Sequence, residues 1–246
     1  MLVVGFPTGV FGANCYLLAT AAGEHCVIVD PGQDAVSAID DALREHRLKP
    51  AAVLLTHGHL DHMWSVLPVC GAHGVPAYVH PADRARLRDP MVSLPSDWVQ
   101  ALGLAGVTFS EPDDVRAVSN GALLEIAGLA LTVDHAPGHT GGSVVFRTSA
   151  GGPGDAPTMF AGDLLFAGSI GRTDLPGGDD AAMRDSLERV VLGAPDETVV
   201  FPGHGAHTTI GRERATNPYL QPLSPPTPRP TTRPTTRPTT QEGATR

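Results

Sequence analysis

Cysteine and lysine are both scarce in this sequence. The 246 residues contain three cysteines, Cys15, Cys26 and Cys70, and one lysine, Lys49, against sixteen arginines. An odd number of widely spaced cysteines provides neither a disulfide framework nor the paired spacing of a thiolate metal site. We therefore expect reduced thiols, a reducing compartment and a cytoplasmic location.

Positive charge is lacking as well. The formal net charge is −9, and because residues 222–246 contribute four arginines against one glutamate, the rest of the chain carries −12. Proteins that bind nucleic acid need a basic face. The charge balance therefore argues against a nucleic-acid partner.

Long apolar runs are also missing. The N-terminal apolar stretch has no basic segment before it and is interrupted by Gly5 and Pro7. A signal peptide needs a basic segment followed by an apolar one, and a membrane-spanning helix needs about 20 apolar residues. We expect neither of them, and no membrane partner.

Composition divides the chain into two parts. With 41% hydrophobic residues, the chain can build one sizeable core, and we predict a single domain over residues 1–221. Beyond it, Arg-Pro-Thr-Thr occurs three times between Arg229 and Thr240. A segment of this composition has nothing with which to form a core. Residues 222–246 are therefore predicted to be a disordered tail.

The densest group of metal-binding residue types is Thr-His-Gly-His-Leu-Asp-His at 56–62. The apolar run directly before it predicts a buried strand, and the apolar stretch after it predicts a helix. His57 and His59 are two apart on extended chain and point to the same side, whereas Asp61 and His62 begin the next element. This arrangement suits two metal ions better than one.

Three further metal-binding side chains follow short apolar strands in the same way. His139 follows the apolar run 129–133, Asp163 follows 158–161, and His204 follows 198–201. A Pro-Gly turn lies close before His139 and before His204. Four separate loops would then gather at one edge of the sheets.

Strand and helix patterns are mixed along the chain rather than strictly alternating. Strands are predicted near 2–6, 13–20, 25–30, 51–55, 75–79, 122–133, 143–148, 158–161 and 198–201. Helices are predicted near 34–47, 62–73, 81–88, 179–192 and 211–216. This order favours two sheets with helices outside them over one parallel sheet.

Several of these segments together resemble the metallo-β-lactamase superfamily, and within it the short hydrolases related to glyoxalase II, the hydroxyacylglutathione hydrolase. The resemblance covers about residues 1–220 and is carried by THGHLDH at 56–62, PGHT at 137–140, GDLLFAGSIGRTDLPGGD at 162–179, PGHG at 202–205 and NPYL at 217–220. It implies an α/β fold of four layers, an αββα sandwich, with the site at the edges of the sheets.

The resemblance also implies two divalent metal ions per chain. The first would be bound by His57, His59 and His139, the second by Asp61, His62 and His204, and Asp163 would bridge both. Imidazole and carboxylate donors without thiolate suit zinc, iron or manganese, of which we expect zinc first.

The implied activity is that of a metal-dependent hydrolase, a thioesterase that cleaves a hydroxyacyl thioester of a low-molecular-weight thiol. A metal-bridging hydroxide, formed near neutral pH, would attack the carbonyl carbon while a metal takes the negative charge on oxygen. Asp61 and Asp163 would be the carboxylates of this catalytic centre. The expected partner is a small-molecule thioester, and a monomer and a dimer are equally admissible.

Four more residues are weaker candidates around the ligands. Asp30 ends an apolar strand and is either an orienting carboxylate for a ligand histidine or a turn carboxylate. Arg172 either anchors substrate or pairs with Asp174 to fix its loop. Thr140 and Ser169 are candidate hydroxyls beside the site or at its rim.

The chain departs from glyoxalase II after His204. It lacks the helical C-terminal region whose basic residues hold the glutathione carboxylate, so another small thiol is equally admissible. Persulfide dioxygenases share the HxHxDH cluster and the GRTD segment but use one iron to activate oxygen, and the LPGGD segment at 175–179 favours the hydrolase. A lactonase or other ester hydrolase, and a metal-binding module without turnover, are the remaining alternatives.

Overall fold

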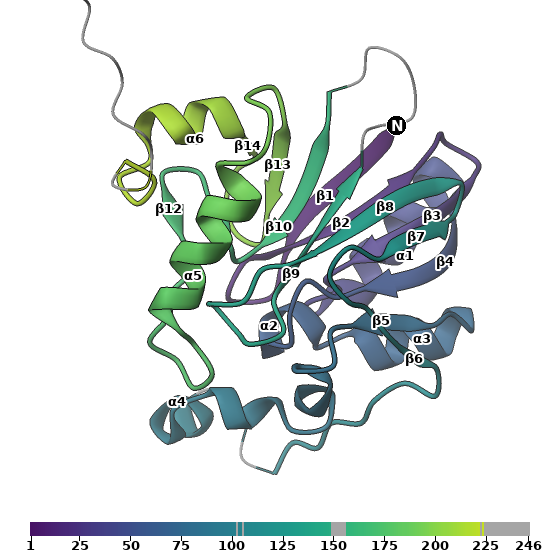
Figure 1. The fold of residues 1–246 in the computed structure, drawn as a ribbon. Helices are drawn as coiled ribbons and strands as arrows, with labels where there is room; N and C mark the ends of the chain where they lie inside the picture. The colour runs from purple at the N-terminus through teal and green to yellow at the C-terminus, as the bar shows by residue number, and fades with distance from the viewer. Residues whose placement is uncertain (102, 105, 149–155, 222, 224–246) are drawn as a thin grey trace, which may run out of the picture.

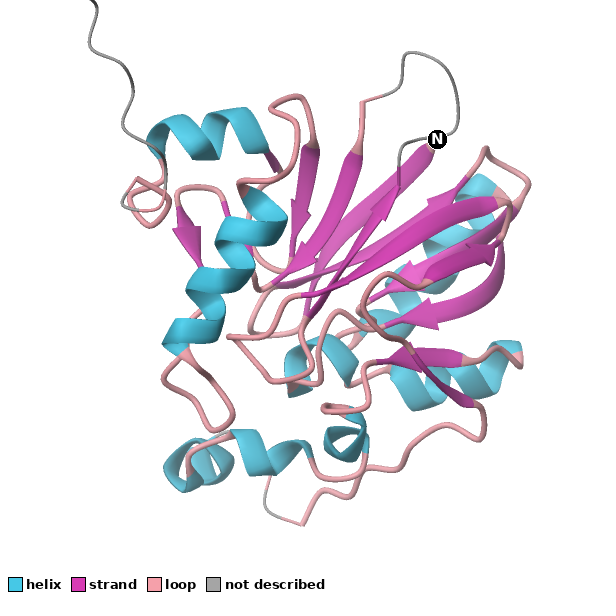
Figure 2. Cartoon of the chain, viewed as in Figure 1, coloured by secondary structure: helices cyan, strands magenta, loops and turns pink. Residues whose placement is uncertain are grey.

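Two six-stranded β-sheets lie face to face, with helices on their outer faces (Figures 1 and 2). The computed structural model describes residues 1–101, 103–104, 106–148, 156–221 and 223. The predicted tail at 222–246 therefore lies outside the described residues, apart from Leu223. The predicted αββα sandwich is confirmed.

The first sheet has the strand order β1-β2-β3-β4-β5-β6. Its strands are β1 (Leu2–Thr8), β2 (Ala13–Ala19), β3 (His25–Val29), β4 (Lys49–Leu54), β5 (Ala77–Val79) and β6 (Val115–Ala117). The strand β2 is antiparallel to both β1 and β3, and β3 to β6 run parallel. Parallel neighbours need crossover connections, and the helices described below provide those that follow β3 and β4.

The second sheet has the strand order β14-β13-β10-β9-β8-β7. Its strands are β7 (Leu123–Ile126), β8 (Leu129–His135), β9 (Val144–Thr148), β10 (Thr158–Gly162), β13 (Val199–Pro202) and β14 (Thr208–Thr209). A separate small hairpin joins β11 (Leu165–Phe166) to β12 (Ser169–Ile170). In this sheet β9 is antiparallel to both β8 and β10, and β13 is parallel to β10, so β8, β10 and β13 all run the same way.

The helices lie in two groups. Those connected with the first sheet are α1 (Ala35–His46), α2 (Leu60–Met63), α3 (Val66–His73), the short 3-10 helices Arg84–Leu87 and Pro90–Ser93, and α4 (Ser96–Ala101). Those beside the second sheet are α5 (Asp180–Ser186), which continues into a π-helical stretch at Leu187–Val191, and α6 (Ile210–Thr216). Within the described ranges, no helix has both the length and the apolar character that crossing a membrane requires.

The core forms three apolar layers, one at each interface of the sandwich. Every residue of β2 is buried: Cys15 and Leu17 belong to the layer shared with α1 and α3, whereas Tyr16 and Leu18 belong to the layer between the sheets. This alternation follows from the two-residue period of a strand. The third layer joins the outer face of the second sheet to α5 and α6. Both sheets are thus covered on both faces.

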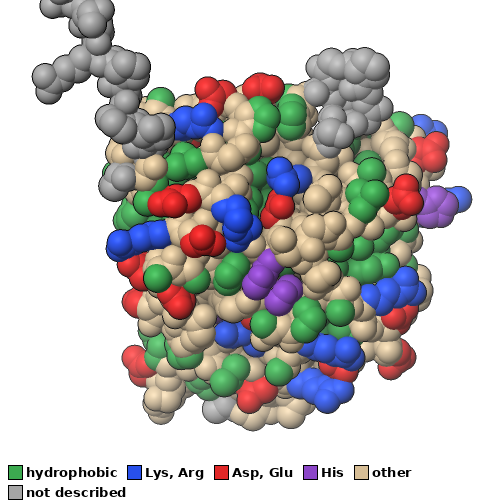
Figure 3. Space-filling view, in the orientation of Figure 1, with side chains coloured by type: hydrophobic (Ala, Val, Ile, Leu, Met, Phe, Trp, Pro, Cys, Tyr) green, Lys and Arg blue, Asp and Glu red, His purple; other side chains and the backbone are tan. Residues whose placement is uncertain are grey.

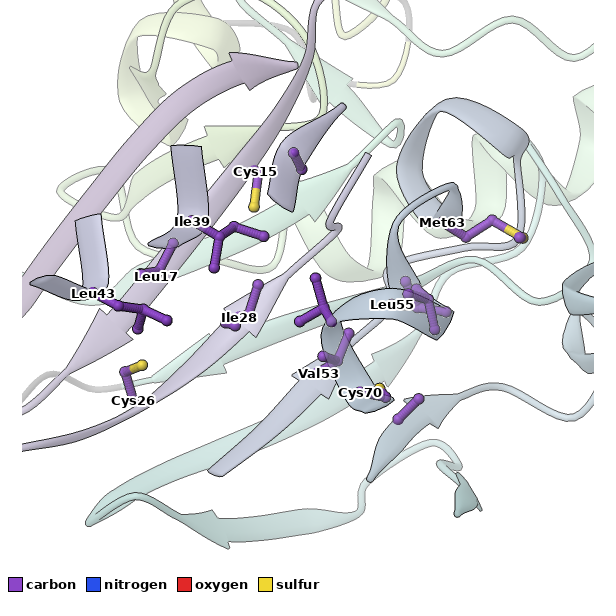
Figure 4. Packing of buried hydrophobic residues seen from close by; sticks show 14 of the residues in the cluster. Cys15, Leu17, Cys26, Ile28, Ile39, Leu43, Val53, Leu55, Met63 and Cys70 are labelled. Carbon is purple, nitrogen blue, oxygen red and sulfur yellow. The ribbon is translucent and has the colours of Figure 1, made fainter. Parts of the chain in front are cut away.

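The three cysteines all lie in the layer between the first sheet and its helices (Figure 4). All three are free thiols. Burial raises the pKa of Cys26 to about 12 and, together with Asp114, that of Cys70 to about 12. They pack as small apolar side chains. Because their pKa values are raised, the thiols stay protonated and are poor nucleophiles.

Charged side chains of both signs are mixed on the surface (Figure 3). Arginines often lie beside carboxylates, as in the pairs Arg84–Glu111 and Arg116–Asp114. The visible face therefore shows no continuous field of one sign.

Two predicted elements are divided in the structure. The strand predicted over 122–133 is the hairpin of β7 and β8, which turns at Ala127 and Gly128, both with positive φ. A two-residue turn with positive φ at both positions matches the twist of hairpin strands. The helix predicted over 62–73 is broken between α2 and α3, where Ser65 Oγ donates to the carbonyl oxygen of Gly32.

The strand directions bring several loops to one edge of the sandwich. The carboxyl ends of β3, β4 and β5 lie together in the first sheet because these strands are parallel, and those of β8, β10 and β13 lie together in the second. The isolated bridge between Ala13 and His204 joins the two sheets at this edge.

Candidate metal centre

Three histidines converge in a first group. His57 and His59 follow β4 and His139 follows β8, so the group joins the two sheets. His59 Nδ1 lies 2.8 Å from His139 Nε2, and the centroid of the His57 ring lies 4.9 Å and 4.8 Å from those of His59 and His139. All three residues are buried. One nitrogen from each lies within 4.8 Å of the others, a spacing that can hold a metal ion.

A second group consists of Asp61, His62 and His204. The first two lie on α2, and His204 follows β13. His204 Nε2 is 3.2 Å from His62 Nε2 and 3.2 Å from Asp61 Oδ2. These donor atoms also lie close enough together to hold one ion.

Asp163, which follows β10, lies between the two groups. Its Oδ2 is 3.3 Å from His139 Nε2 in the first group and 3.6 Å from His204 Nε2 in the second, and its Oδ1 is 3.4 Å from His62 Nε2. One carboxylate therefore contacts both groups. All seven residues predicted as ligands are brought together.

Hydrogen bonds on the outer side of three rings fix which nitrogen carries the proton. Asp30 accepts from His62 Nδ1 at 3.0 Å and from the Thr56 hydroxyl at 2.6 Å. Because the Thr56 hydroxyl donates to Asp30, its oxygen accepts from His57 Nδ1, 3.1 Å away. His139 Nδ1 donates to the carbonyl oxygen of Arg172 at 2.7 Å. In His57 and His139 the Nε2 atom keeps its lone pair, as a metal ligand requires.

The donor set fits a metal ion. His57 Nε2 and Asp163 Oδ1 are buried, and neither has a hydrogen-bond partner among the described residues. Leaving a buried acceptor without a partner costs about 1–3 kcal/mol. Imidazole nitrogens and carboxylate oxygens that face one point, with lone pairs unused, are the donors that zinc, iron and manganese accept.

Burial and neighbouring charge set the protonation of the site. Burial, helped by the neighbouring histidines, lowers the pKa of His57 and of His59 well below the ordinary value. Burial alone would also lower the pKa of His62, but Asp61, Asp163 and Asp30 outweigh it and raise that pKa to about 10. Burial likewise opposes ionisation of Asp61, yet His62 and His204 hold its pKa below the usual range.

The second group forms the accessible side of the site. The side chains of His204 and Asp61 are 29% and 21% exposed, whereas the histidines of the first group are buried. The Phe166 ring meets the His204 ring edge to face, at 5.9 Å between centroids. A substrate would therefore reach the site from the side of His204 and Asp61.

The weaker candidates take different positions. The Arg172 guanidinium pairs with Asp174 at 2.7 Å and lies over the ring of Trp98 on α4, while its carbonyl oxygen holds His139. Of the two roles expected for Arg172, these contacts match the one in which it pairs with Asp174 and fixes its loop. Beside this loop lies a cavity of about 600 Å³.

Of the other three weaker candidates, Asp30 is the one that contacts a predicted ligand directly, at His62. The Thr140 hydroxyl is fully buried and donates to Asp83. Ser169 lies in β12, where its hydroxyl is 3.4 Å from the carbonyl oxygen of Ile170, and no hydrogen bond to a predicted ligand is found for it in the described part of the chain.

Two residues around the ligands were not predicted from the sequence, Thr56 and Asp83. Thr56 is the residue directly before His57, and its hydroxyl connects that ring to Asp30. Asp83 follows the end of β5 in His-Pro-Ala-Asp, a strand followed by a turn and a carboxylate. Asp163 was predicted from a similar context, but the residues that Asp83 contacts cannot be read from it.

Comparison with known protein families agrees with this geometry. The model of the metallo-β-lactamase superfamily matches residues 8–204, which include all seven predicted ligands. The chain belongs to the metallo-β-lactamase superfamily. Members of this superfamily are generally metal-dependent hydrolases.

Curated proteins match this chain over most of their length. An uncharacterized protein of Mycobacterium tuberculosis is 48% identical over 225 residues, which are 91% of this chain and 100% of that protein. The hydroxyacylglutathione hydrolase GloC of Haemophilus influenzae is 33% identical over 218 residues, 89% of this chain and 97% of GloC.

Solved structures of the same fold are similar as well. BLEG-1, a B3 metallo-β-lactamase, has a TM-score of 0.78 and 36% identity, over 89% of this chain and 100% of BLEG-1. TTHA1623 in a di-iron-bound form has a TM-score of 0.71 and 37% identity, over 88% of this chain and 100% of TTHA1623.

Proposed function

We propose that this chain is a two-metal thioesterase that hydrolyses a hydroxyacyl thioester of a low-molecular-weight thiol. The observation that carries the proposal is the position of Asp163, whose carboxylate contacts His139 of one group and His62 and His204 of the other. A carboxylate shared by two sets of donors is what a pair of ions needs.

The roles of the residues follow from their contacts. His57, His59 and His139 would hold the first ion, Asp61, His62 and His204 the second, and Asp163 both. When bound, the two ions supply a water that ionises near neutral pH and positive charge for the carbonyl oxygen of the substrate. Asp61 and Asp163 complete the catalytic centre as its carboxylates.

The residues of the chain perform the remaining tasks. Asp30, Thr56 and the Arg172 carbonyl orient the ligand rings, so that little reorganisation is needed when the ions bind. Since His204 and Asp61 are the accessible residues, the thioester carbonyl would approach from their side. A leaving thiol ionises near pH 8.5, so it departs as a thiolate with little acid assistance.

The acyl-thiol class is supported by the relationship to GloC, a hydroxyacylglutathione hydrolase. The helix that follows His204 in this chain, α6, has seven residues. It offers no long basic surface for the glutathione carboxylate, so we propose the hydroxyacyl thioester as the substrate class and leave the thiol to experiment.

The alternatives use the same scaffold differently. A persulfide dioxygenase shares the HxHxDH cluster and uses one iron, so the convergence of Asp61, His62 and His204 does not distinguish it from a hydrolase. The LPGGD segment at 175–179 favours the hydrolase. A lactonase or another ester hydrolase would use the same ions and the same hydroxide. These enzymes are distinguished by substrate.

The deciding experiment is steady-state hydrolysis of S-lactoylglutathione by protein loaded in turn with zinc, iron and manganese. We expect turnover with at least one metal and none after His59→Ala, because that substitution removes one of the three donors of the first group. Metal content is measured on the same samples, and two ions per chain are expected.

Other outcomes would redirect the proposal. If the loaded protein hydrolyses no thioester, the assignment of substrate class is wrong. Oxygen uptake on glutathione persulfide by the iron-loaded protein would then identify a dioxygenase, and cleavage of a lactone would identify a lactonase. Two bound ions without turnover on any of these substrates would identify a metal-binding module.

A further inference from the structure

Asp83 is a buried carboxylate outside the proposed ligand set. It lies after β5, just before the first 3-10 helix, and its exposed fraction is zero. A charge removed from water is costly unless each oxygen accepts hydrogen bonds. Asp83 meets this requirement with three hydrogen bonds and one ion pair.

The donors come from the loops that carry the first metal group. Asp83 Oδ2 accepts from the backbone N–H of Gly58 at 2.8 Å and from the Thr140 hydroxyl at 2.6 Å. Its Oδ1 accepts from the backbone N–H of Gly142 at 3.1 Å and faces Arg86 Nε at 3.3 Å. Gly58 stands between His57 and His59, and Thr140 directly follows His139. One carboxylate therefore holds the backbone beside all three histidines of that group.

Arg86 extends this connection to a third loop. Its Nη2 donates to the carbonyl oxygen of Pro176 at 3.2 Å, in the loop whose residue Arg172 holds the His139 ring. The Arg86 side chain is 11% exposed, and its Nη1 is buried without a hydrogen-bond partner within the described residues. The Arg86 side chain is therefore largely enclosed between these loops.

The two ligand loops pack closely around Asp83. A Cβ atom added at Gly142 would lie 2.5 Å from Asp83 Cγ, and one added at Gly58 would lie 2.8 Å from Arg86 Cδ and 3.1 Å from Asp83 Cβ. The backbones of both ligand loops are thus packed directly against this pair of side chains. A shift of Asp83 would move both loops.

His59 shows why such an anchor is needed. The outer nitrogens of His57, His62 and His139 have hydrogen-bond partners, but His59 Nε2 is buried and has none among the residues described. The direction of this ring is therefore set by its backbone and its packing. Next to His59 in the chain, the backbone N–H of Gly58 donates to the Asp83 side chain, and this hydrogen bond helps to fix the backbone of His59.

We propose that Asp83 is a positioning residue that fixes the geometry of the first metal group by tying the loop of His57 and His59 in one sheet to the loop of His139 in the other. The proposal rests on the proposed metal centre. It assigns Asp83 no contact with substrate.

The test compares metal binding by the wild-type protein and by Asp83→Asn. An asparagine keeps the shape of the side chain but places an amide NH2 group where one carboxylate oxygen now faces two donating groups. Because partners of this kind tune ligands, we expect the dissociation constant of the first ion, measured by chelator competition, to rise about 10–100-fold. The visible spectrum of the cobalt-loaded protein should change with it, since the ring geometry changes.

Glu213→Gln is the matched control. Glu213 is also buried and also accepts hydrogen bonds from several donors, namely Gly168 N–H, the Thr208 hydroxyl and Asn217 Nδ2, but none of these residues is a proposed ligand. We expect this variant to lose stability and to keep the wild-type dissociation constant and cobalt spectrum. A purely structural role for Asp83 would make the two variants behave alike.

Thr140→Val removes a single link to Asp83 and gives a milder second variant in case Asp83→Asn does not fold. We expect its dissociation constant to rise several-fold. If the metal dissociation constants and cobalt spectra of Asp83→Asn and Thr140→Val match those of a wild-type protein that binds metal, the proposal for Asp83 is wrong and the proposed function stands. A wild-type protein that binds no metal would overturn the proposed function, and this inference with it.

Discussion

Single hydrogen bonds decide what the histidines of this site can bind. A neutral imidazole has one donor and one acceptor nitrogen, and only the acceptor can hold a metal. Asp30 determines this choice for two rings, His62 directly and His57 through Thr56. Asp30 itself adopts a positive φ of 50°, a conformation that a short polar side chain tolerates better than most.

Asp30→Asn should weaken metal binding without removing a proposed ligand. The amide offers one acceptor in place of two, so either the Thr56 N–H or the pair of donors at Oδ2 loses its partner. We expect metal affinity to fall by about 10–100-fold, as is typical for partners of ligand histidines. Titration against a chromophoric chelator measures this. Asp114→Asn, which alters an exposed ion pair with Arg116, should bind metal like the wild type.

The raised pKa of His62 predicts how metal affinity depends on pH. Because the pKa is raised to about 10, metal-stripped protein keeps this ring charged at neutral pH, and a bound ion must displace its proton. Affinity for the second ion should therefore rise with pH between 7 and 9, by up to about tenfold per unit for each proton released. Calorimetry in buffers of different ionisation enthalpy counts the protons. Binding without proton release would contradict the pKa shift.

The sequence revealed the ligands more readily than the residues that orient them. His57, His59 and Asp61 stand in one short motif whose density is unusual, so they are visible without a structure. Thr56 and Asp83 are ordinary residue types, and their importance depends on contacts over long stretches of chain, such as the one between Asp83 and Thr140. Those contacts exist only after both sheets have formed.

At the scale of elements, the loops that follow the strands are tightly packed even at their glycines, as Gly203 shows. Gly203 follows β13 directly, and its backbone N–H donates to the carbonyl oxygen of Gly162 at 2.8 Å. A Cβ atom added to Gly203 would lie 2.1 Å from Asp163 Oδ1 and 2.8 Å from His62 Cε1. This glycine is required by space, because its neighbours are the proposed ligands themselves.

Gly203→Ala is therefore expected to displace Asp163 or His62 and to lower the number of ions bound per chain from two toward one. Overpacking of this kind costs about 1–3 kcal/mol of stability. Metal analysis after dialysis and thermal unfolding measure the two effects. Two ions bound per chain in this variant would show that the loop containing Gly203 can shift to accommodate the added methyl group.

Gly71→Ala is the control for that substitution. Gly71 is an exposed residue of α3, and a Cβ atom added there would meet nothing within 4 Å among the described atoms. Alanine in a helix interior is more stable than glycine by about 0.5–1 kcal/mol. This variant should gain stability and bind two ions.

Element boundaries were predicted less well than element types. The apolar runs before the ligands were all identified as strands, because short apolar runs that end in Pro or Gly turns are typical of buried strands. The hairpin turn at Ala127 and Gly128 was missed, since Ala-Gly is a weaker turn signal than Asn-Gly. The short strand β6 was missed as well, since its three residues, Val115 to Ala117, are too few to show a period.

At the scale of the whole molecule, the site joins the two sheets. His57, His59, Asp61 and His62 follow β4 of the first sheet, whereas His139, Asp163 and His204 follow strands of the second. Each proposed ion would therefore be held by residues from both sheets. The apolar layer between the sheets, with Phe146 and Phe160 fully buried in it, provides the rest of the connection.

Metal binding should therefore stabilise the whole fold and not one loop. An ion that binds only the folded chain adds about 2.7 kcal/mol at a free concentration of 100 times its dissociation constant. For a domain of this size that is about 5–10 °C in the midpoint of thermal unfolding. We expect zinc or manganese to raise the midpoint by this amount and a chelator to reverse it. Magnesium, which prefers oxygen ligands, should have little effect. A midpoint that no transition metal shifts would mean that the ligands of the two sheets do not share an ion.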